Sequence, residues 1–387
     1  MKSKKVCLFT AFCFLVVLAS AQNPSTPNTI SGRDSAYTVI TTAVPFLGIT
    51  PDARHAGLGD AGVATSPDAN SAYWNAAKLV FIDKQYGGAM SVTPWLAKII
   101  NDMWIASIAG FYKIDREQAV AASFKYFDLG DIFLRGDQNQ DNGSFNPREF
   151  AFDVTYSRML TENLSVGLTG RYIHSNLTGT FSGNGASDAR PASTVAADFG
   201  VYYTKPLEGS RASNLTLGAF LSNIGGKISY SNSSNKDFLP TNLRVGGTYT
   251  TELDPYNSFT FVLDFNKLMV PTIDKGQTVL GGMFGSFSDA PGGSREELHE
   301  ITTSAGVEYW YNKTVSARLG YFNEAKDKGN RKYMTVGLGF RSAKGFGIDL
   351  AYLIPTNKRE HPLAETIRFT LLIQIAKKVV EEESVTD

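Results

Sequence analysis

The chain of 387 residues has only two cysteines and four histidines. Cys7 and Cys13 both lie in residues 1–21, which read as a secretory signal with a basic start, an apolar centre and a small-residue cleavage site at Ala19-Ser20-Ala21. Cleavage there leaves a chain without cysteine, which excludes disulfides, thiolate metal ligands and cysteine nucleophiles. No two histidines stand at a metal-ligand spacing. We therefore predict no metal and no cofactor.

Long apolar runs are also missing. The apolar part of the signal, Val6–Leu18, is shorter than the ~20 residues that a membrane helix needs, and no later run reaches ~18 residues. The mean hydropathy of −0.14 fits a soluble protein, and it equally fits membrane strands whose two faces cancel. Net charge is close to neutral, because 37 basic and 37 acidic residues become 34 and 37 once Lys2, Lys4 and Lys5 are removed. This balance excludes a nucleic-acid partner.

Strict alternation of apolar and polar residues dominates the sequence from Tyr86 onward. Phe259, Phe261, Leu263 and Phe265, for example, alternate with polar or smaller residues, which is the periodicity of a β-strand. About fourteen such segments have the ~9–11 residues of a tilted membrane strand. They lie at residues 86–93, 103–113, 118–128, 149–160, 164–176, 193–204, 214–224, 240–252, 258–268, 298–311, 314–324, 332–342, 346–354 and 365–376.

The connections between these segments alternate between short and long. Short ones follow the even segments, as at 114–117 and 312–313, and long ones follow the odd segments, as at 129–148 and 269–297. Such alternation is typical of an outer-membrane barrel with periplasmic turns and extracellular loops. We therefore predict an all-β fold, a transmembrane antiparallel β-barrel of about 14 strands in the cell outer membrane, with both chain ends in the periplasm. A soluble all-β domain does not require this alternation.

Charged residues within the strands fall mostly on the face opposite the apolar one. A lipid-facing Arg near the bilayer centre costs ~2–4 kcal/mol, so we place these side chains in the barrel lumen. Acids and bases balance there, which favours ion pairs over a charge-selective pore. The predicted lumen charges are Asp153, Asp198, Asp264, Glu308 and Asp349 with Arg171, Arg244, Arg318, Arg341 and Arg368.

A segment of different character, residues 51–85, precedes the strands. Gly57, Gly59 and Gly62 alternate with small residues and suit tight turns and close backbone approach. Asp68 suits the N-cap of a helical run that continues to Leu79. A small, Ala- and Gly-rich piece ahead of a barrel is typical of a plug packed inside it. The predicted divisions are a signal at 1–21, a periplasmic arm at 22–50, a plug at 51–85, a barrel at 86–376 and a periplasmic tail at 377–387.

The residues of this segment carry a family resemblance. Asp68-Ala69 and the run from Tyr73 through Asn75, Ala76 and Ala77 resemble the plug of the FadL/OMPP1 family of outer-membrane barrels, which usually has Asn-Pro-Ala at the last three positions. Pro51–Arg54, Gly59–Gly62 and Ala72–Asn75 resemble more closely the PorV branch of that superfamily, which belongs to the type IX secretion system.

This resemblance implies a non-enzymatic role in protein export. Its partners would be the type IX translocon barrel, the C-terminal domains of secreted cargo, the proteins of the cell-surface attachment complex, and outer-membrane lipid. The chain would bind cargo at the translocon and shuttle it to the attachment complex. The alternative is a FadL-like transporter of hydrophobic small molecules, which requires an apolar lumen.

Enzyme and calcium motifs are weak. No nucleophile elbow, phosphate loop or zinc-protease motif is present. His174 and Ser175 are neighbours on a strand, so they point to opposite faces and cannot act together directly. Asp137, Asn139 and Asp141 resemble a calcium loop, but the required glycine and glutamate come one position late. A solvated polar loop is the favoured interpretation of that segment.

Two loops carry large apolar side chains that suggest a contact surface. We expect them outside the cell, where they would bind a partner protein. The alternative is that they fold back over the barrel mouth or lie at the membrane interface. The residues are Trp95, Leu96, Ile99 and Ile100 in the first loop and Leu268, Met269 and Val270 in the fifth.

Overall fold

The computed structural model describes residues 39–96, 102–135, 140–177, 190–209, 211–230, 236–356 and 366–375. Several predicted features lie outside these residues. They are the signal at 1–21, most of the arm, Ile99, Ile100, Asp137, Asn139 and the tail at 377–387.

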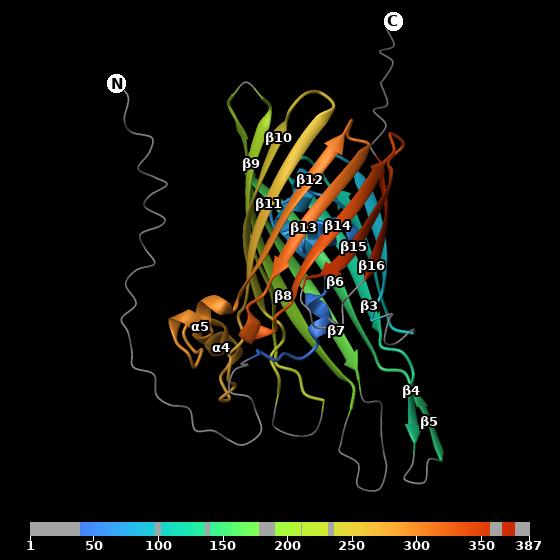
Figure 1. Ribbon diagram of the computed structural model, residues 1–387, viewed down its shortest axis with the longest axis vertical. Helices are drawn as coiled ribbons and strands as arrows, with labels where there is room; N and C mark the ends of the chain where they lie inside the picture. The colour runs from blue at the N-terminus through green and yellow to red at the C-terminus, as the bar shows by residue number, and fades with distance from the viewer. Residues whose placement is uncertain are drawn as a thin grey trace, which may run out of the picture.

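Fourteen antiparallel strands close into one barrel (Figure 1). Each strand pairs with its neighbour in sequence, except that β3 pairs with β6 and β1 pairs with β16 to close the sheet. The predicted fold class and strand number are thus confirmed. The strands are β1 (Tyr86–Pro94), β2 (Trp104–Lys113), β3 (Gln118–Asp128), β6 (Arg148–Thr161), β7 (Leu164–Asn176), β8 (Ala192–Leu207), β9 (Ser213–Gly225), β10 (Asn242–Glu252), β11 (Asn257–Leu268), β12 (Ile301–Tyr311), β13 (Val315–Asn323), β14 (Lys332–Arg341), β15 (Phe346–Pro355) and β16 (Ile367–Ile375).

The two faces of the sheet differ as the alternation requires. On β11, Phe261, Leu263 and Phe265 are exposed on the outer face, whereas Thr260 and Asp264 are buried on the inner face. Lipid covers the exposed apolar belt of such a sheet. The closed sheet is stable there because every backbone group of the wall is paired within it. No helix among the described residues is long and apolar enough to cross a membrane.

Short turns gather at one end of the barrel and long loops at the other (Figure 1). The loop between β3 and β6 forms a separate two-stranded hairpin that projects beyond the barrel. The loop between β11 and β12 folds into two short helices that lie beside the wall. These elements are β4 (Ile132–Arg135) and β5 (Asp141–Phe145), α4 (Val279–Gly285) and α5 (Ser294–His299), with a further turn, η3 (Lys326–Lys328), between β13 and β14.

The segment ahead of β1 fills the lumen. Its elements are η1 (Pro45–Gly48), α2 (Ala53–Ala56), α3 (Ser71–Trp74) and η2 (Ala76–Phe81). Phe46 and Leu47 of η1 pack with side chains at the long-loop end of the wall, such as Phe127 of β3. The later residues Leu79 and Val80 pack near the short-turn end, against Phe111 of β2. The chain thus runs along the lumen before it becomes β1.

Two expectations about this segment need correction. Residues 43–49, the last part of the arm, lie at the long-loop end instead of on the periplasmic side, because their apolar side chains are buried among those of the barrel mouth. The single helical run expected after Asp68 is two short pieces, because Asn75 adopts an extended backbone with φ −167° between α3 and η2. Asp68 is not the N-cap; its carboxylate accepts from the Asn70 N–H at 2.9 Å.

The lipid-facing assignment of β11 is testable by substitution. Leu263→Arg, at mid-strand on the outer face, should lower the free energy of unfolding in vesicles by about 2–4 kcal/mol. Val315→Arg, which lies at the short-turn end of β13, should cost only about 0–1 kcal/mol because it reaches the interface. Denaturant titration of each variant, refolded into lipid vesicles, measures both free energies of unfolding. Equal losses at the two positions would contradict this placement of the membrane.

Candidate functional site

The plug lies directly on the backbone of wall glycines. A Cβ on Gly320 of β13 would fall 2.0 Å from the Gly59 amide nitrogen, and one on Gly218 of β9 would fall 2.4 Å from the Val63 carbonyl oxygen. On β7, a Cβ on Gly167 would meet the backbone between Ala76 and Ala77 at 2.4 Å. Only glycine permits such approach. The plug is therefore fitted to the wall and leaves no gap at these points.

Gly57, Gly59 and Gly62 of the plug have different roles. Gly59 has φ +71°, a left-handed conformation that favours glycine. A Cβ on Gly62 would lie 2.4 Å from the Trp74 ring, and one on Gly57 would lie 3.2 Å from Gly337 Cα of β14. Gly59 therefore permits a turn. Gly62 permits close packing inside the plug, and Gly57 permits close packing against the wall.

A buried polar chain holds the plug together. Asp52 Oδ2 contacts His55 Nδ1 at 2.7 Å, and its Oδ1 accepts from Trp74 Nε1 at 2.8 Å. His55 Nε2 lies 2.9 Å from the Thr65 hydroxyl, which also accepts from Lys78 Nζ at 2.8 Å. All five side chains are buried. Burial of polar groups is tolerated only with such partners, so this network fixes one plug conformation.

Asn75 joins the plug to the wall. Its side-chain oxygen accepts from the Ala77 N–H at 3.1 Å, and its Nδ2 donates to the carbonyls of Val63 at 3.1 Å and Val201 of β8 at 2.9 Å. Ala76 and Ala77 follow as buried residues. Three bonds from one buried amide lock the break between α3 and η2 against β8.

Ion pairs in the lumen join the plug to the adjacent wall. Arg54 donates to both oxygens of Glu308 at 3.0 and 2.9 Å and to Asp68 Oδ2 at 3.0 Å. Arg318 donates to Glu308 Oε1 at 2.7 Å and to Asp349 Oδ1 at 2.8 Å. The paired, two-pronged geometry of Arg with carboxylate gives both strength and direction. This cluster links α2 to β12, β13 and β15.

Three other lumen charges each contact the plug on their own, and a fourth pairs within the wall. Asp264 Oδ2 accepts from the Gly62 N–H at 2.6 Å and from the Val63 N–H at 2.9 Å. The Arg244 guanidinium lies 4.9 Å from the centre of the Trp74 ring, and Arg368 Nη1 lies 3.3 Å from Asp60 Oδ1. Arg341, at the short-turn end of β14, pairs with Asp349 of the wall at 2.6 Å.

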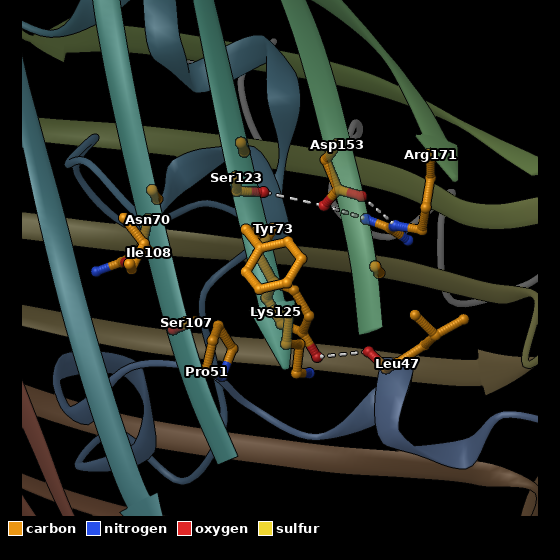
Figure 2. A pocket seen from close by; sticks show the side chains of 14 residues that line it. Leu47, Pro51, Asn70, Tyr73, Ser107, Ile108, Ser123, Lys125, Asp153 and Arg171 are labelled. Atoms are coloured by element: carbon orange, nitrogen blue, oxygen red, sulfur yellow. Dashed lines mark hydrogen bonds and ion pairs between the residues drawn. The ribbon is translucent and has the colours of Figure 1, made fainter. Parts of the chain in front are cut away.

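A second wall cluster borders a small cavity (Figure 2). Arg171 donates to Asp153 Oδ1 at 2.7 Å, and its Nη2 lies 3.0 Å from Asp198 Oδ2. Lys125 donates to the Phe46 carbonyl at 2.8 Å, and the Tyr73 hydroxyl donates to the Leu47 carbonyl at 3.2 Å. The cavity among these side chains has a volume of ≈ 30 Å³, room for about two water molecules.

The ten charges predicted for the lumen all lie on its inner face, and each has a partner there. Sequence reasoning did not find the plug residues that pair with them, namely Arg54, which pairs with Glu308, and Asp60, which pairs with Arg368. The signal was available, because residues 51–62, PDARHAGLGDAG, place charges inside an otherwise small and apolar segment. The high Ala and Gly content of the segment indicates close packing and gives no sign of ion pairs with the wall.

Among the apolar loop residues predicted to bind partners, the described ones fold back over the barrel mouth, which was the alternative interpretation. Trp95 packs edge-on against Phe127 with ring centres 6.1 Å apart, and Leu96 joins the same cluster with η1. Met269 and Val270 are buried, and Leu268 is half-buried as the last residue of β11. This is a correction of the exposed surface that the sequence suggested. These side chains cover apolar plug and wall residues at the barrel mouth.

The described residues considered for catalysis and calcium are His174, Ser175 and Asp141. His174 Nδ1 contacts the Ser193 hydroxyl on the outer face, while the buried Ser175 hydroxyl donates to Glu149 Oε1 at 2.6 Å. Asp141 Oδ1 accepts from the Gly143 N–H at 2.9 Å within β5. Each of these groups thus has a structural partner, and His174 and Ser175 point to opposite faces of the wall.

Comparison with known proteins places the chain. The family model for the type IX secretion system protein PorV matches residues 32–275, more than half of the sequence. The chain belongs to the PorV family. It is therefore an outer-membrane component of the type IX secretion system, as the resemblance implied. No curated protein matches it in sequence.

Solved structures support the fold of this PorV-family barrel. The toluene transporter TodX of P. putida aligns with TM-score 0.52 at 12% identity, covering 84% of this chain and 98% of that one. The toluene transporter TbuX of Ralstonia pickettii aligns with TM-score 0.50 at 12% identity, covering 85% of this chain and 99% of that one. At such identity the likeness concerns architecture, a FadL-type barrel, and not the ligand.

Because the plug and the wall are in close contact, we expect a single added methyl group on a wall glycine to displace the plug. Gly320→Ala inserts a Cβ against the backbone of Leu58 and Gly59, so the plug must shift at a cost of about 1–3 kcal/mol. We expect higher conductance in planar bilayers and a lower unfolding midpoint. Gly170→Ala is the control, because nothing lies within 4 Å of its added Cβ. Unchanged conductance and stability in the Gly320 variant would contradict this fit.

Asn75 offers a second test. Asn75→Leu leaves the Val63 and Val201 carbonyls without their donor, which should cost about 1–3 kcal/mol of stability and loosen the plug. Asn214→Leu, which removes a single bond to Thr204 at the short-turn end, should leave conductance unchanged. Planar-bilayer recordings beside denaturant titrations separate the two variants. Equal conductance in both would remove Asn75 from the seal.

Proposed function

We propose that this barrel binds the C-terminal domain of secreted cargo at the type IX translocon and carries that cargo to the attachment complex on the cell surface. Membership of the PorV family supports the export role. The observation that carries the proposal is the filled lumen. Plug and ion pairs occupy the interior, so binding has to use the surface outside the barrel.

The alternative, transport of hydrophobic small molecules through the barrel, requires an apolar path. The described lumen instead holds buried carboxylates and guanidinium groups, and the cavity beside Lys125 and Arg171 has only ≈ 30 Å³. An apolar ligand there would strip charged groups of their partners, which is strongly unfavourable. The lumen therefore favours the export role.

The hairpin β4–β5 is the surface that we propose for the cargo or translocon contact. It extends past the barrel at the long-loop end (Figure 1), and the Phe133 side chain is 66% exposed, with Ile132 exposed beside it. β4 and β5 pair only with each other among the described residues. Their outer edges thus present backbone N–H and C=O groups to which a partner strand can pair.

Truncating the hairpin's apolar side chains tests this contact. Ile132→Ser with Phe133→Ser should weaken capture by ~2 kcal/mol or more, about 30-fold in Kd, if Phe133 fills a partner pocket. Co-purification from detergent-solubilised outer membrane, probed for the translocon and for cargo, measures the loss. Heat-modifiable gel mobility verifies that the barrel is folded.

The matched control is Tyr256→Ser, which removes a similarly exposed aromatic ring at the opposite, short-turn end. It should leave recovery of both partners unchanged. Full recovery with the folded hairpin variant would show that the hairpin is not the contact.

A further inference from the structure

The loop between β11 and β12 exposes an uncharged apolar stripe. Leu280, Phe284 and Phe287 are 59%, 66% and 49% exposed. Their spacing of four and three residues places them on one side of α4 and its following turn. From Gln277 to Ser288 the loop has no charged residue. Phe287 also lies against Lys267, whose Nζ is 5.6 Å from the ring centre. Three large apolar side chains so exposed on one side of a helix are unusual on a surface in water.

The opposite side of α4 is fixed to the barrel end. A Cβ on Gly282 would lie 2.8 Å from the Phe238 ring and 2.9 Å from Pro271, and Met283 beside it is buried. The stripe is therefore the outward side of a helix whose inward side already packs on other loops. Rotation of α4 to hide the stripe would expose Met283 and break this packing.

Ion pairs hold the rest of the loop in place. Lys267 Nζ lies 2.6 Å from Glu300 Oε2, and Lys328 Nζ lies 3.0 Å from Glu300 Oε1 and 2.6 Å from Glu296 Oε1. Burial disfavours the charged form of Lys328, but its hydrogen bonds to Glu296 and Glu300 raise its pKa overall. The loop is thus anchored to the end of β11 and to η3 by these ion pairs.

The position of the loop indicates what covers the stripe. Figure 1 shows α4 and α5 outside the barrel outline, beside the wall, instead of over its mouth. The loop leaves the wall at Leu268, three residues after Phe265, an exposed member of the apolar belt. Lys275 precedes the uncharged segment and Arg295 follows it at the start of α5, and both are exposed, whereas Asp289 directly after the segment is half-buried. An apolar stripe next to the lipid belt, with the exposed basic residues Lys275 and Arg295 on the same loop, matches an interfacial membrane segment.

We propose that α4 lies in the outer leaflet of the membrane, with Leu280, Phe284 and Phe287 among lipid acyl chains and Lys275 and Arg295 near anionic headgroup phosphates. The ligand is a lipid surface, and the contact continues the lipid belt of β10 and β11. It would fix the tilt and rotation of the barrel in the bilayer. This inference does not depend on the proposed cargo contact, which uses the hairpin on another loop.

Site-directed spin labelling can test the depth of α4, because no cysteine follows Cys13 in the sequence. Phe284→Cys and Leu280→Cys are labelled with a nitroxide and reconstituted into vesicles of phosphatidylcholine and phosphatidylglycerol. Accessibility to oxygen, which concentrates in lipid, is compared with accessibility to a water-soluble nickel complex. Leu263→Cys in the lipid belt and Lys326→Cys on an exposed loop are the reference positions.

We expect the ratio of oxygen to nickel accessibility at both α4 positions to be several-fold higher than at position 326, with a depth of about 5–10 Å in the headgroup and acyl boundary. A ratio equal to that at 326 would overturn the proposal and leave the stripe to a partner protein. Spin–spin broadening that disappears when protein is diluted in lipid would also overturn it, in favour of a second copy of the chain. Neither result would bear on the hairpin variants.

Discussion

The pairing of Arg54 with Glu308 is the interaction on which the rest of the interior depends. Both side chains are buried, and a buried charge without its partner is strongly destabilising. Glu308 in turn faces Arg318, which faces Asp349. The charges on several strands can therefore be buried only when the plug contributes its guanidinium. Plug and wall are in this sense one folding unit, although their sequences look unrelated.

The barrel could be predicted from sequence because its evidence is local and repeated. A period of two over each strand and the alternation of short and long connections recur along the chain, so an error in one segment does not change the result. The bounds of β7 and β11 agree with the predicted segments to within a residue. The lumen face followed from the same periodicity, which placed Asp264 and Arg318 inside without any knowledge of their partners.

The contacts of the plug and loops could not be predicted from sequence periodicity. Arg54 and Glu308 are separated by 254 residues, and no periodicity relates them. Helices of four residues, as in α2 and α3, are too short to show a helical pattern. Loops also lack a period that distinguishes an inward from an outward face. Trp95 and Met269 therefore read as exposed although they pack inward, and the sequence around Phe284 does not show that its side chain points outward.

The path of the plug imposes an order on biogenesis. Residues 43–49 occupy the end of the barrel with the long loops, and η2 leads into β1 near the other end. Strand β1 completes the wall by pairing with β16, the last strand. The seam between first and last strand cannot form before the plug is inside, unless the chain is threaded through a finished ring. The ion pairs of Arg54 with Glu308 and of Asp60 with Arg368 need both plug and wall in place, so the contacts that seal the pore also stabilise the closed cylinder.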